Sequence, residues 1–474
     1  MSAAPETAGK KPEHHRRPWR DNIEAVTMAI VMAVMLKYFI VEAYQIPTGS
    51  MQPTLMGNDE AGIKDRIIVD KLSLHFRDPE RFEVVVFKYP LDRSKSFIKR
   101  ICGMPGEDLK IQNGDLWTRK DPGESYKVLR RPPPVQREVW KRIHPGDPRY
   151  SAWKPDGAAR AWTIQGRETV SARGDGSVRL PNDGGSVVDN YRDGYPGKMG
   201  DVLSRAGRFS ASHSVGDLRI EGQAAALPGC KAVTIELREG DRRCSFVLPG
   251  PASAEGARPG IAVEGGQGSP RGDGAARKEA ESPWRLPAGR SVAFAAQNMD
   301  DLLSLEVDGD VVAELEIPPA SDQTSCFALQ VAGEGADFTD LEVFRDIYYT
   351  EDGKKSEFSI PPGHYVMLGD NTQDSSDSRF WTFRTMGPDE DGRRVRGNWF
   401  PPQNPISIPG DPQGMRVYFR DEWGELHVFF SRNDDPPVFA EQPFVAREQI
   451  VGRAVAVFWP FSPNLNVWRL KWIH

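Results

Sequence analysis

Two short segments of the chain carry side chains that could together cleave a peptide bond. Ser50 lies in the turn-forming run Ile-Pro-Thr-Gly-Ser-Met-Gln-Pro-Thr, and Lys99 lies in an apolar, strand-like stretch. A serine hydroxyl becomes a nucleophile when a neighbouring base takes its proton, and a neutral lysine amine can act as that base. Taken singly, each residue has a plainer explanation, because serine beside glycine is common in turns and a strand lysine commonly reaches solvent.

The surroundings of Lys99 favour a buried amine. In a strand, Phe97, Lys99 and Ile101 share one face, while Ile98 and Arg100 share the other. A lysine with an ordinary pKa of about 10.4 is neutral in only about one molecule in two thousand at pH 7. A catalytic Lys99 therefore requires burial that lowers its pKa by about two units or more.

A third segment, residues 363–381, is a strand-like run that leads into a dense polar loop. The loop combines Gly-Asp-Asn at 369–371 with Ser375, Asp377 and Arg379. It offers a hydroxyl, a carboxylate and a guanidinium within a few residues, and such groups form charge-assisted hydrogen bonds.

These three segments, in this order, resemble the bacterial type I signal peptidases, the serine peptidase family S26. The runs at 65–72 and 81–90, and those near 450–454 and 469–474, also fit the family pattern. The resemblance covers residues 19–120, 358–385 and 445–474, which is less than half of the chain.

The resemblance implies a role for each matching residue. Ser50 is the expected nucleophile, Lys99 the general base, and the Ser50 N–H with the Thr48 hydroxyl the oxyanion hole. Ser375, Asp377, Arg379 and Arg100 are expected to support the site, with Arg379 paired to Asp377. Shallow pockets for small side chains, as in Ala-x-Ala sequences, are expected from Ile46, Pro47, Met51, Leu55 and Ile98. The expected substrates are the signal peptides of exported preproteins.

The N-terminal residues predict a membrane anchor. Residues 1–22 are polar and basic, and an apolar run follows from Ala25 to Leu36. Crossing a hydrocarbon core of about 30 Å requires the helix to continue to about Val41. The basic residues place the N-terminus in the cytoplasm and the remainder outside, as in a single-pass protein of the bacterial inner membrane. The alternative is a secretory peptide cleaved near Val41-Glu42-Ala43.

Composition predicts a mainly β protein, because Gly (45) and Pro (39) are abundant. The resemblance implies a signal-peptidase-type β core. An inserted β-sandwich is predicted by alternating apolar and polar residues at 218–221, 232–237, 244–248, 303–309 and 327–331. The sandwich pattern is loosely similar to laminin-G or concanavalin-like folds, and residues 249–283 are expected to form a flexible loop within it. We predict a cytoplasmic tail at 1–22, a transmembrane helix at 23–41, core segments at 42–144, 351–385 and 446–474, and insertions at 145–350 and 386–445.

Several classes of partner are disfavoured. A net charge of −6 gives no broad basic surface for nucleic acid. The four cysteines lack zinc-ligand spacing, so no metal or cofactor is expected. Cys230 and Cys244 could form a disulfide or remain thiols.

The role of the insertion stays open, and two alternatives to the signal peptidase function remain. One is a membrane-tethered protein whose sandwich binds a protein or glycan, and the other is the same Ser–Lys chemistry acting on a different exported substrate.

Overall fold

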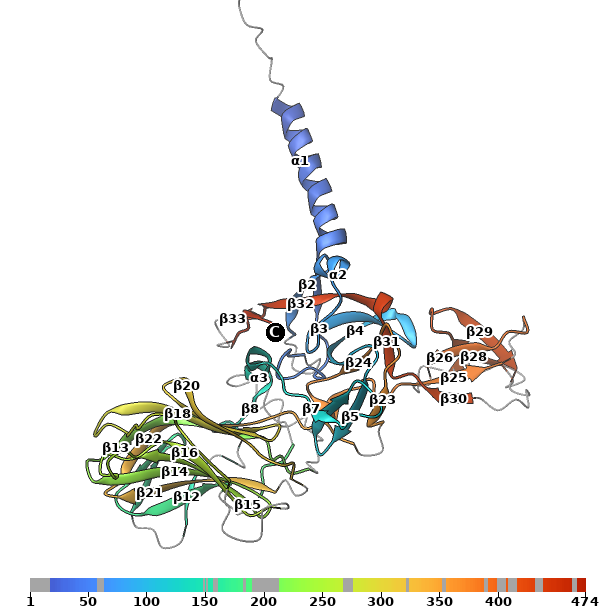
Figure 1. The fold of residues 1–474 in the computed structure, drawn as a ribbon. Coiled ribbons are helices and arrows are strands. Elements are labelled where there is room, and N and C mark those ends of the chain that lie inside the picture. The colour runs from blue at the N-terminus through green and yellow to red at the C-terminus, as the bar shows by residue number, and fades with distance from the viewer. Residues whose placement is uncertain are drawn as a thin grey trace, which may run out of the picture.

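The structure is a computed structural model that is built mainly of antiparallel strands, as the composition predicts (Figure 1). It describes residues 18–57, 64–147, 150, 152–156, 161–181, 185–189, 213–266, 276–320, 324–351, 355–387, 391–398, 406–407, 416–430, 438–462 and 467–474.

The first sheet collects strands from distant parts of the chain. Its order is β1-β2-β32-β3-β4-β24-β31, and β35 also pairs with β32. The strands are β1 (Val41–Gln45), β2 (Arg66–Asp70), β3 (Val84–Tyr89), β4 (Asp92–Gly103), β24 (His364–Leu368), β31 (Phe444–Ala446), β32 (Ile450–Trp459) and β35 (Lys471–Trp472). The short helices α2 (Ser73–Phe76), η3 (Thr372–Asp374) and η4 (Arg447–Gln449) lie in its connections.

Both faces of this sheet are buried, which explains the nearly continuous apolar run of β3. Val84 and Val86 pack in one hydrophobic cluster with Ile98, while Val85 and Phe87 pack in another. The alternation follows the two-residue period of a strand. The sheet is therefore a rigid base for side chains on β4 and on the loops beside it.

A small sheet borders the first one and leads into the large insertion. Its order is β23-β5-β6-β7, and helix α3 (Pro133–Val139) follows it in sequence. The strands are β5 (Asp108–Gln112), β6 (Asp115–Arg119), β7 (Lys127–Val128) and β23 (Glu357–Ser359).

Two further sheets form what we call the two-sheet insert, residues 141–345. One has the order β10-β11-β22-β13-β18-β19-β20 with β8 on β22, and the other has the order β17-β16-β15-β14-β21-β12-β9. Their inward side chains share one hydrophobic cluster that includes Ile220, Phe246 and Phe338. The segments expected to be strands at 218–221, 232–237, 244–248, 303–309 and 327–331 lie within or end just beyond β13, β14, β15, β19 and β21. A specific laminin-G or concanavalin relationship stays a prediction.

The strands of the first of these sheets are β8 (Lys141–His144), β10 (Trp162–Gln165), β11 (Thr169–Ala172), β13 (Leu218–Ala226), β18 (Ser291–Met299), β19 (Leu302–Val307), β20 (Asp310–Glu316) and β22 (Ala336–Arg345). Those of the second are β9 (Lys154–Pro155), β12 (Gly176–Leu180), β14 (Cys230–Glu239), β15 (Arg242–Pro249), β16 (Gly260–Glu264), β17 (Ala276–Glu279) and β21 (Ser325–Gly333).

Two details of this region differ from the sequence-based expectations, and a third concerns a pair of cysteines whose state the sequence left open. The insert begins at Lys141, four residues before the expected boundary, because β8 pairs with β22. The expected flexible loop 249–283 contains β16 and β17, which pair with each other, while its residues 267–275 lie outside the described part. Cys230 and Cys244 are both buried free thiols, so they form no disulfide with each other.

The second insertion contains two three-stranded sheets. In one, β25 (Thr382–Met386) pairs with β26 (Val395–Asn398) and β30 (Val438–Glu441); in the other, β28 (Arg416–Arg420) pairs with β27 (Ile406–Ser407) and β29 (Leu426–Phe430). Alternating apolar and polar residues at 414–419 and 425–430 predict a hairpin, and β28 and β29 form it. A further short pair, β33 (Phe461–Ser462) and β34 (Val467–Trp468), lies near the C-terminus.

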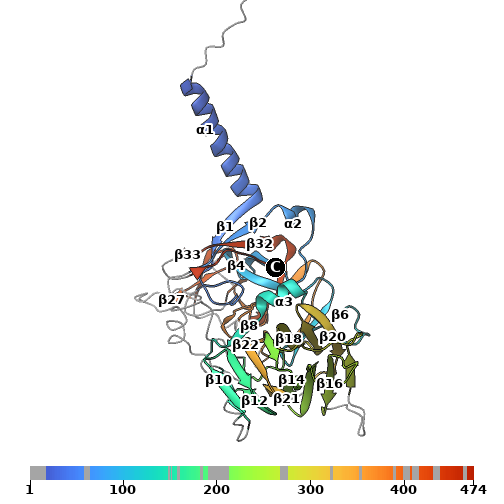
Figure 2. The same ribbon diagram turned by 90° about the vertical axis from the view of Figure 1, so that its left-hand side faces the viewer.

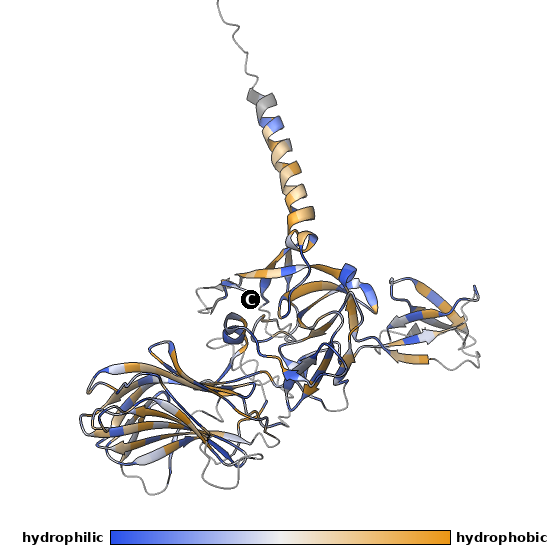
Figure 3. Ribbon diagram, viewed as in Figure 1, coloured by the Kyte–Doolittle hydropathy of each residue, from blue (hydrophilic) through white to orange (hydrophobic). Residues whose placement is uncertain are grey.

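Helix α1 (Pro18–Met35) projects away from the sheets in both views (Figures 1 and 2). It continues into a π-helical turn, η1 (Leu36–Ile40), and β1 begins at Val41, so the predicted helix over 23–41 ends earlier than expected. Most of α1 is apolar (Figure 3). In the described residues, no helix has both the length and the apolar character needed to cross a membrane, so the predicted transmembrane helix is not supported. Residues 1–17 of the expected tail lie outside the described range.

Candidate active site

Strand β4 positions Lys99 in the interior of the protein. The strand is buried from Lys99 to Gly103, and only 4% of Lys99 is exposed. The Lys99 ammonium lies 5.8 Å from the centre of the Phe97 ring, on the face that the strand pattern predicts. Lys99 Nζ also donates a hydrogen bond to the Ile98 carbonyl at 3.0 Å.

Ser50 lies in the turn that follows β1. The Gln52 N–H donates to the Gly49 carbonyl at 3.1 Å and closes this turn, and Ser50 is only 6% exposed. Its hydroxyl oxygen accepts a hydrogen bond from Lys99 Nζ at 2.7 Å. The structure thus brings together two residues that are 49 positions apart in sequence.

Burial lowers the pKa of Lys99 to about 8. The negative charges of Asp377, Asp370 and Asp374 oppose this shift, and the positive charge of Arg379 adds to it. At a pKa of about 8, roughly one amine in ten is neutral at pH 7. Lys99 therefore meets the condition that the sequence sets for a lysine base.

The Thr48 hydroxyl lies beside the same serine. Thr48 Oγ1 is 3.5 Å from Ser50 Oγ, and Thr48 itself is exposed to solvent. A donor in this position could reach an oxygen that develops negative charge when Ser50 attacks a carbonyl group.

The loop after β24 holds the Ser50 turn in place. The Asn371 N–H donates to the Ser50 carbonyl at 3.1 Å, and Asn371 Nδ2 donates to the Gly49 carbonyl at 3.1 Å. A Cβ at Gly369 would lie 2.6 Å from the Ser50 carbonyl oxygen and 2.2 Å from Ser375 Oγ, so only glycine fits this contact.

Asp377 and Arg379 form the predicted ion pair. Arg379 Nε and Nη2 donate to the two Asp377 oxygens at 2.8 and 2.7 Å, and both side chains are fully buried. Asp377 also accepts the Gly369 N–H at 3.1 Å, which shapes the loop. Ser375 is buried near Ser50, and no hydrogen bond between its Oγ and Lys99 is present among the described residues.

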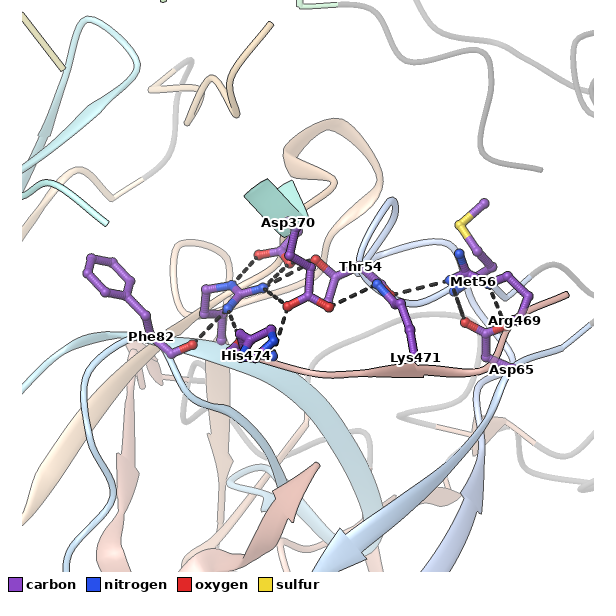
Figure 4. A network of polar contacts seen from close by, with 10 residues as sticks. Thr54, Met56, Asp65, Phe82, Asp370, Arg469, Lys471 and His474 are labelled. Atoms are coloured by element: carbon purple, nitrogen blue, oxygen red, sulfur yellow. Dashed lines mark hydrogen bonds and ion pairs between the residues drawn. The ribbon is translucent and has the colours of Figure 1, made fainter. Parts of the chain in front are cut away.

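Arg100, which follows Lys99, joins four parts of the chain. Figure 4 shows its partners Asp370, Thr54, Phe82 and His474. Its guanidinium makes five hydrogen bonds: two to the Asp370 carboxylate and one each to Thr54 Oγ1, the Phe82 carbonyl and the His474 carbonyl. A guanidinium has five N–H donors, so all are used. Thr54 Oγ1 in turn donates to Asp370 at 2.5 Å. The arrangement fixes the Gly-Asp-Asn loop to β4.

The residues expected to form substrate pockets divide into two groups. Ile46, Met51 and Leu55 lie in a hydrophobic core cluster with exposed fractions of 2%, 0% and 0%, so they support the Ser50 turn from within and do not face a substrate. Pro47 is exposed and Ile98 is partly buried, and these two have surface that a substrate could contact.

Within the described residues, two groups of side chains have the spacing of metal ligands, and both lie outside this site. They are Asp115, Asp217 and Asp300, which are buried, and Asp421, Glu425 and His427 in the β28–β29 hairpin. The absence of a metal or cofactor stays a prediction.

Sequence reasoning missed three residues that order the site: Thr54, Asp370 as the partner of Arg100, and Asn371 as the partner of Ser50. All three residues lie in motifs that match the family, and this was the one sign in the sequence that they are important. Their hydrogen-bond partners could not be predicted, because the contacts join residues up to 322 positions apart.

Comparison with known proteins agrees with the motif analysis. The family described as signal peptidase, peptidase S26, matches residues 19–142 and 305–389. A probable signal peptidase I-2 of Synechocystis is 37% identical over 118 residues, which cover 24% of this chain and 51% of the relative. Signal peptidase I of Leptolyngbya laminosa is 34% identical over 127 residues, covering 25% and 59%. The matched parts therefore span between half and three fifths of these relatives.

Solved structures add little. A carbohydrate binding module from Bacillus subtilis, CBM66, matches with a TM-score of 0.22 and 13% identity, covering 42% of this chain and 94% of the module. The Caenorhabditis elegans galectin LEC-6 matches with a TM-score of 0.21 and 13% identity, covering 28% and 82%. Both TM-scores are too low to carry an argument about this chain.

The family match and the signal peptidase I homologues cover only part of the chain, as expected if large insertions interrupt it. Over its matched segments, the chain is similar to the signal peptidase family, peptidase S26.

Proposed function

We propose that the chain is a serine endopeptidase that removes signal peptides from exported preproteins through Ser50 and Lys99. The observation that carries the proposal is the 2.7 Å contact between Ser50 Oγ and a buried amine whose pKa is lowered to about 8. A hydroxyl and a base in this relation are the minimum for nucleophilic attack on a peptide carbonyl.

In the proposed reaction, Lys99 takes the proton of Ser50 as the hydroxyl oxygen bonds to the scissile carbonyl carbon. One Lys99 N–H is directed to the Ile98 carbonyl, which orients the amine. The amine then gives its proton to the departing peptide nitrogen, and water hydrolyses the acyl-enzyme by the same route. The Ser50 N–H and the Thr48 hydroxyl stabilise the oxyanion, while Asp377, Arg379, Arg100 and Ser375 keep the surrounding loop in shape.

The proposal also covers the cleavage specificity of the enzyme and its attachment to the membrane. Cleavage after small-x-small sequences follows from the family resemblance, with Pro47 and Ile98 as contacts. Attachment to membrane lipid is supported by α1, where large apolar side chains such as Ile23, Met28 and Met32 are more than half exposed. Lipid contact would remove this apolar surface from water. The alternative of a tethered binding protein is not favoured by the comparisons.

The direct test is cleavage of a preprotein with an Ala-x-Ala site by the full chain in detergent, with the products identified by mass spectrometry. We expect the wild-type enzyme to cleave the preprotein after the second alanine of the Ala-x-Ala site. We expect Ser50→Ala not to cleave it. An intact preprotein with wild-type enzyme, or unchanged cleavage by Ser50→Ala, would refute the proposal.

The pH dependence of cleavage should follow the titration of Lys99. The active form is the neutral amine, and its fraction rises with pH through the lowered pKa of about 8. At pH 6 only about 1% is neutral, so kcat/KM should rise about tenfold per unit from pH 6 to 7 and level off above about pH 9. A profile that is flat between pH 6 and 8 would exclude Lys99 as the titrating base.

The Thr48→Val variant should distinguish a role of the Thr48 hydroxyl in catalysis from a role in folding. Valine keeps the β-branched shape but removes the hydroxyl, so kcat should fall by about 10² to 10³ if that hydroxyl stabilises the oxyanion. Thr48→Ser keeps the hydroxyl and is the matched control, expected to retain most activity. Because Thr48 is exposed, the melting temperature should change little in either variant. Normal kcat in Thr48→Val would leave the Ser50 N–H as the assigned donor.

A further inference from the structure

A second buried lysine, Lys141, connects the two-sheet insert to the loop that holds Ser50. Lys141 is the first residue of β8, which pairs with β22 of the insert, and only 3% of it is exposed. Its Nζ donates a hydrogen bond to the main-chain carbonyl of Asp370 at 2.9 Å.

The carbonyl that Lys141 binds belongs to the peptide unit that holds the nucleophile. The Asp370 C=O and the Asn371 N–H form one planar peptide group, and this N–H donates to the Ser50 carbonyl at 3.1 Å. In a trans peptide the oxygen and the hydrogen point in opposite directions, so fixing the oxygen also aims the N–H. The N–H donor on the oxygen side further polarises the group and strengthens the bond to Ser50.

The segment that leaves the insert holds the same loop from its other end. Thr372 Oγ1 donates to the Tyr348 carbonyl at 2.7 Å, three residues beyond the end of β22. Arg379 Nη1 donates to the carbonyl and the hydroxyl of Thr350, both at 3.2 Å. Both chain segments that join the insert to the rest of the protein therefore contact the loop 369–379.

The burial of Lys141 needs such a contact. Burial lowers the pKa of Lys141 well below its ordinary value, and the nearby Arg345 lowers it further. An ammonium in this position is unfavourable unless carbonyl or carboxylate oxygens receive its protons. A methionine of similar length would fill the same space without the free-energy cost of burying an amine. The contribution of Lys141 therefore lies in the hydrogen bonds that its amine makes.

We infer that Lys141 is a positioning residue for Ser50, and that the two-sheet insert keeps the loop 369–379 in its working shape. The inference rests on the proposed function for its catalytic consequence. Its structural consequence, the orientation of the Asp370–Asn371 peptide, does not depend on any substrate.

The test uses the full chain with Lys141→Met and a matched control, Arg142→Met, in the same strand. Arg142 is half exposed and pairs with Glu342 on the insert surface. Lys141→Met should speed hydrogen exchange of the Asn371 amide and lower kcat about tenfold to a hundredfold with little change in KM, as expected for loss of a buried hydrogen bond. Arg142→Met should change neither.

Unchanged Asn371 exchange and unchanged kcat in a folded Lys141→Met protein would overturn the inference. If Lys141→Met does not fold, Thr372→Val decides, because it removes the Tyr348 contact from the same loop; faster exchange supports the inference and unchanged exchange overturns it. If wild-type enzyme cleaves no preprotein, the proposed function fails, while the exchange comparison still decides the role of Lys141.

Discussion

Replacing Lys99 with alanine should reduce preprotein cleavage by about 10⁴-fold or more, because loss of the base leaves Ser50 with no group to take its proton. Lys99→Arg should fail as well. A guanidinium has a pKa above about 12 and cannot supply a neutral base near pH 8. The rate of product formation from an Ala-x-Ala preprotein gives both results.

The control for this experiment is Lys95→Ala in the same strand. Lys95 is about half exposed and pairs with Asp92, so its replacement removes an equal charge from β4 without touching the site. It should cleave at close to the wild-type rate. Substantial turnover by Lys99→Ala, with Lys95→Ala unaffected, would assign the role of base to another residue.

Asp370→Ala should destabilise the protein severely. The change leaves Arg100, which is fully buried, without the carboxylate that takes two of its five hydrogen bonds. Breaking a buried ion pair by removing one partner typically costs about 3–5 kcal/mol. Urea unfolding of the variant should show a decrease of this size in the free energy of unfolding, while Asp121→Ala, in an exposed turn, should show little change.

The pH dependence of this effect gives a second check. Burial alone would raise the pKa of Asp370, but Arg100 and Thr54 more than offset it, and the net pKa lies below the ordinary value. A carboxylate of this kind stabilises the fold above its unfolded pKa of about 3.9, and the contribution is lost as the pH falls through the folded pKa. The stability difference between wild type and Asp370→Ala should therefore be constant near neutral pH and shrink below about pH 4. A difference that grows on acidification would contradict the ion-pair assignment.

The sequence predicted that Ser50 and Lys99 act as a pair, and the structure has Ser50 Oγ and Lys99 Nζ 2.7 Å apart. Alternation along β4 placed Lys99 on the Phe97 face, and the structure has that contact at 5.8 Å. The Asp377–Arg379 pair was also predictable, because its members are two positions apart in one motif.

Other features depend on contacts that no local pattern encodes. In the sequence, Lys141 has the pattern of an ordinary strand lysine. Its hydrogen-bond partner, the Asp370 carbonyl, lies 229 positions away. Met51 and Leu55 follow the serine as substrate-contacting residues would, yet their side chains fill the core. Strands β16 and β17 could not be predicted, because residues 249–283 are rich in Gly, Pro and charged residues. Strands at a sheet edge can have this composition, which is also typical of loops.

The account rests on Ser50 and Lys99 acting as one catalytic unit, and the most direct measurement is a comparison of four cleavage rates: wild type, Ser50→Ala, Lys99→Ala and the double variant. Residues that act together show losses that do not multiply. We predict that the double variant cleaves the Ala-x-Ala preprotein within about threefold of the slower single variant. Losses that multiply in the double variant would show that the two residues act independently and would contradict the Ser–Lys mechanism.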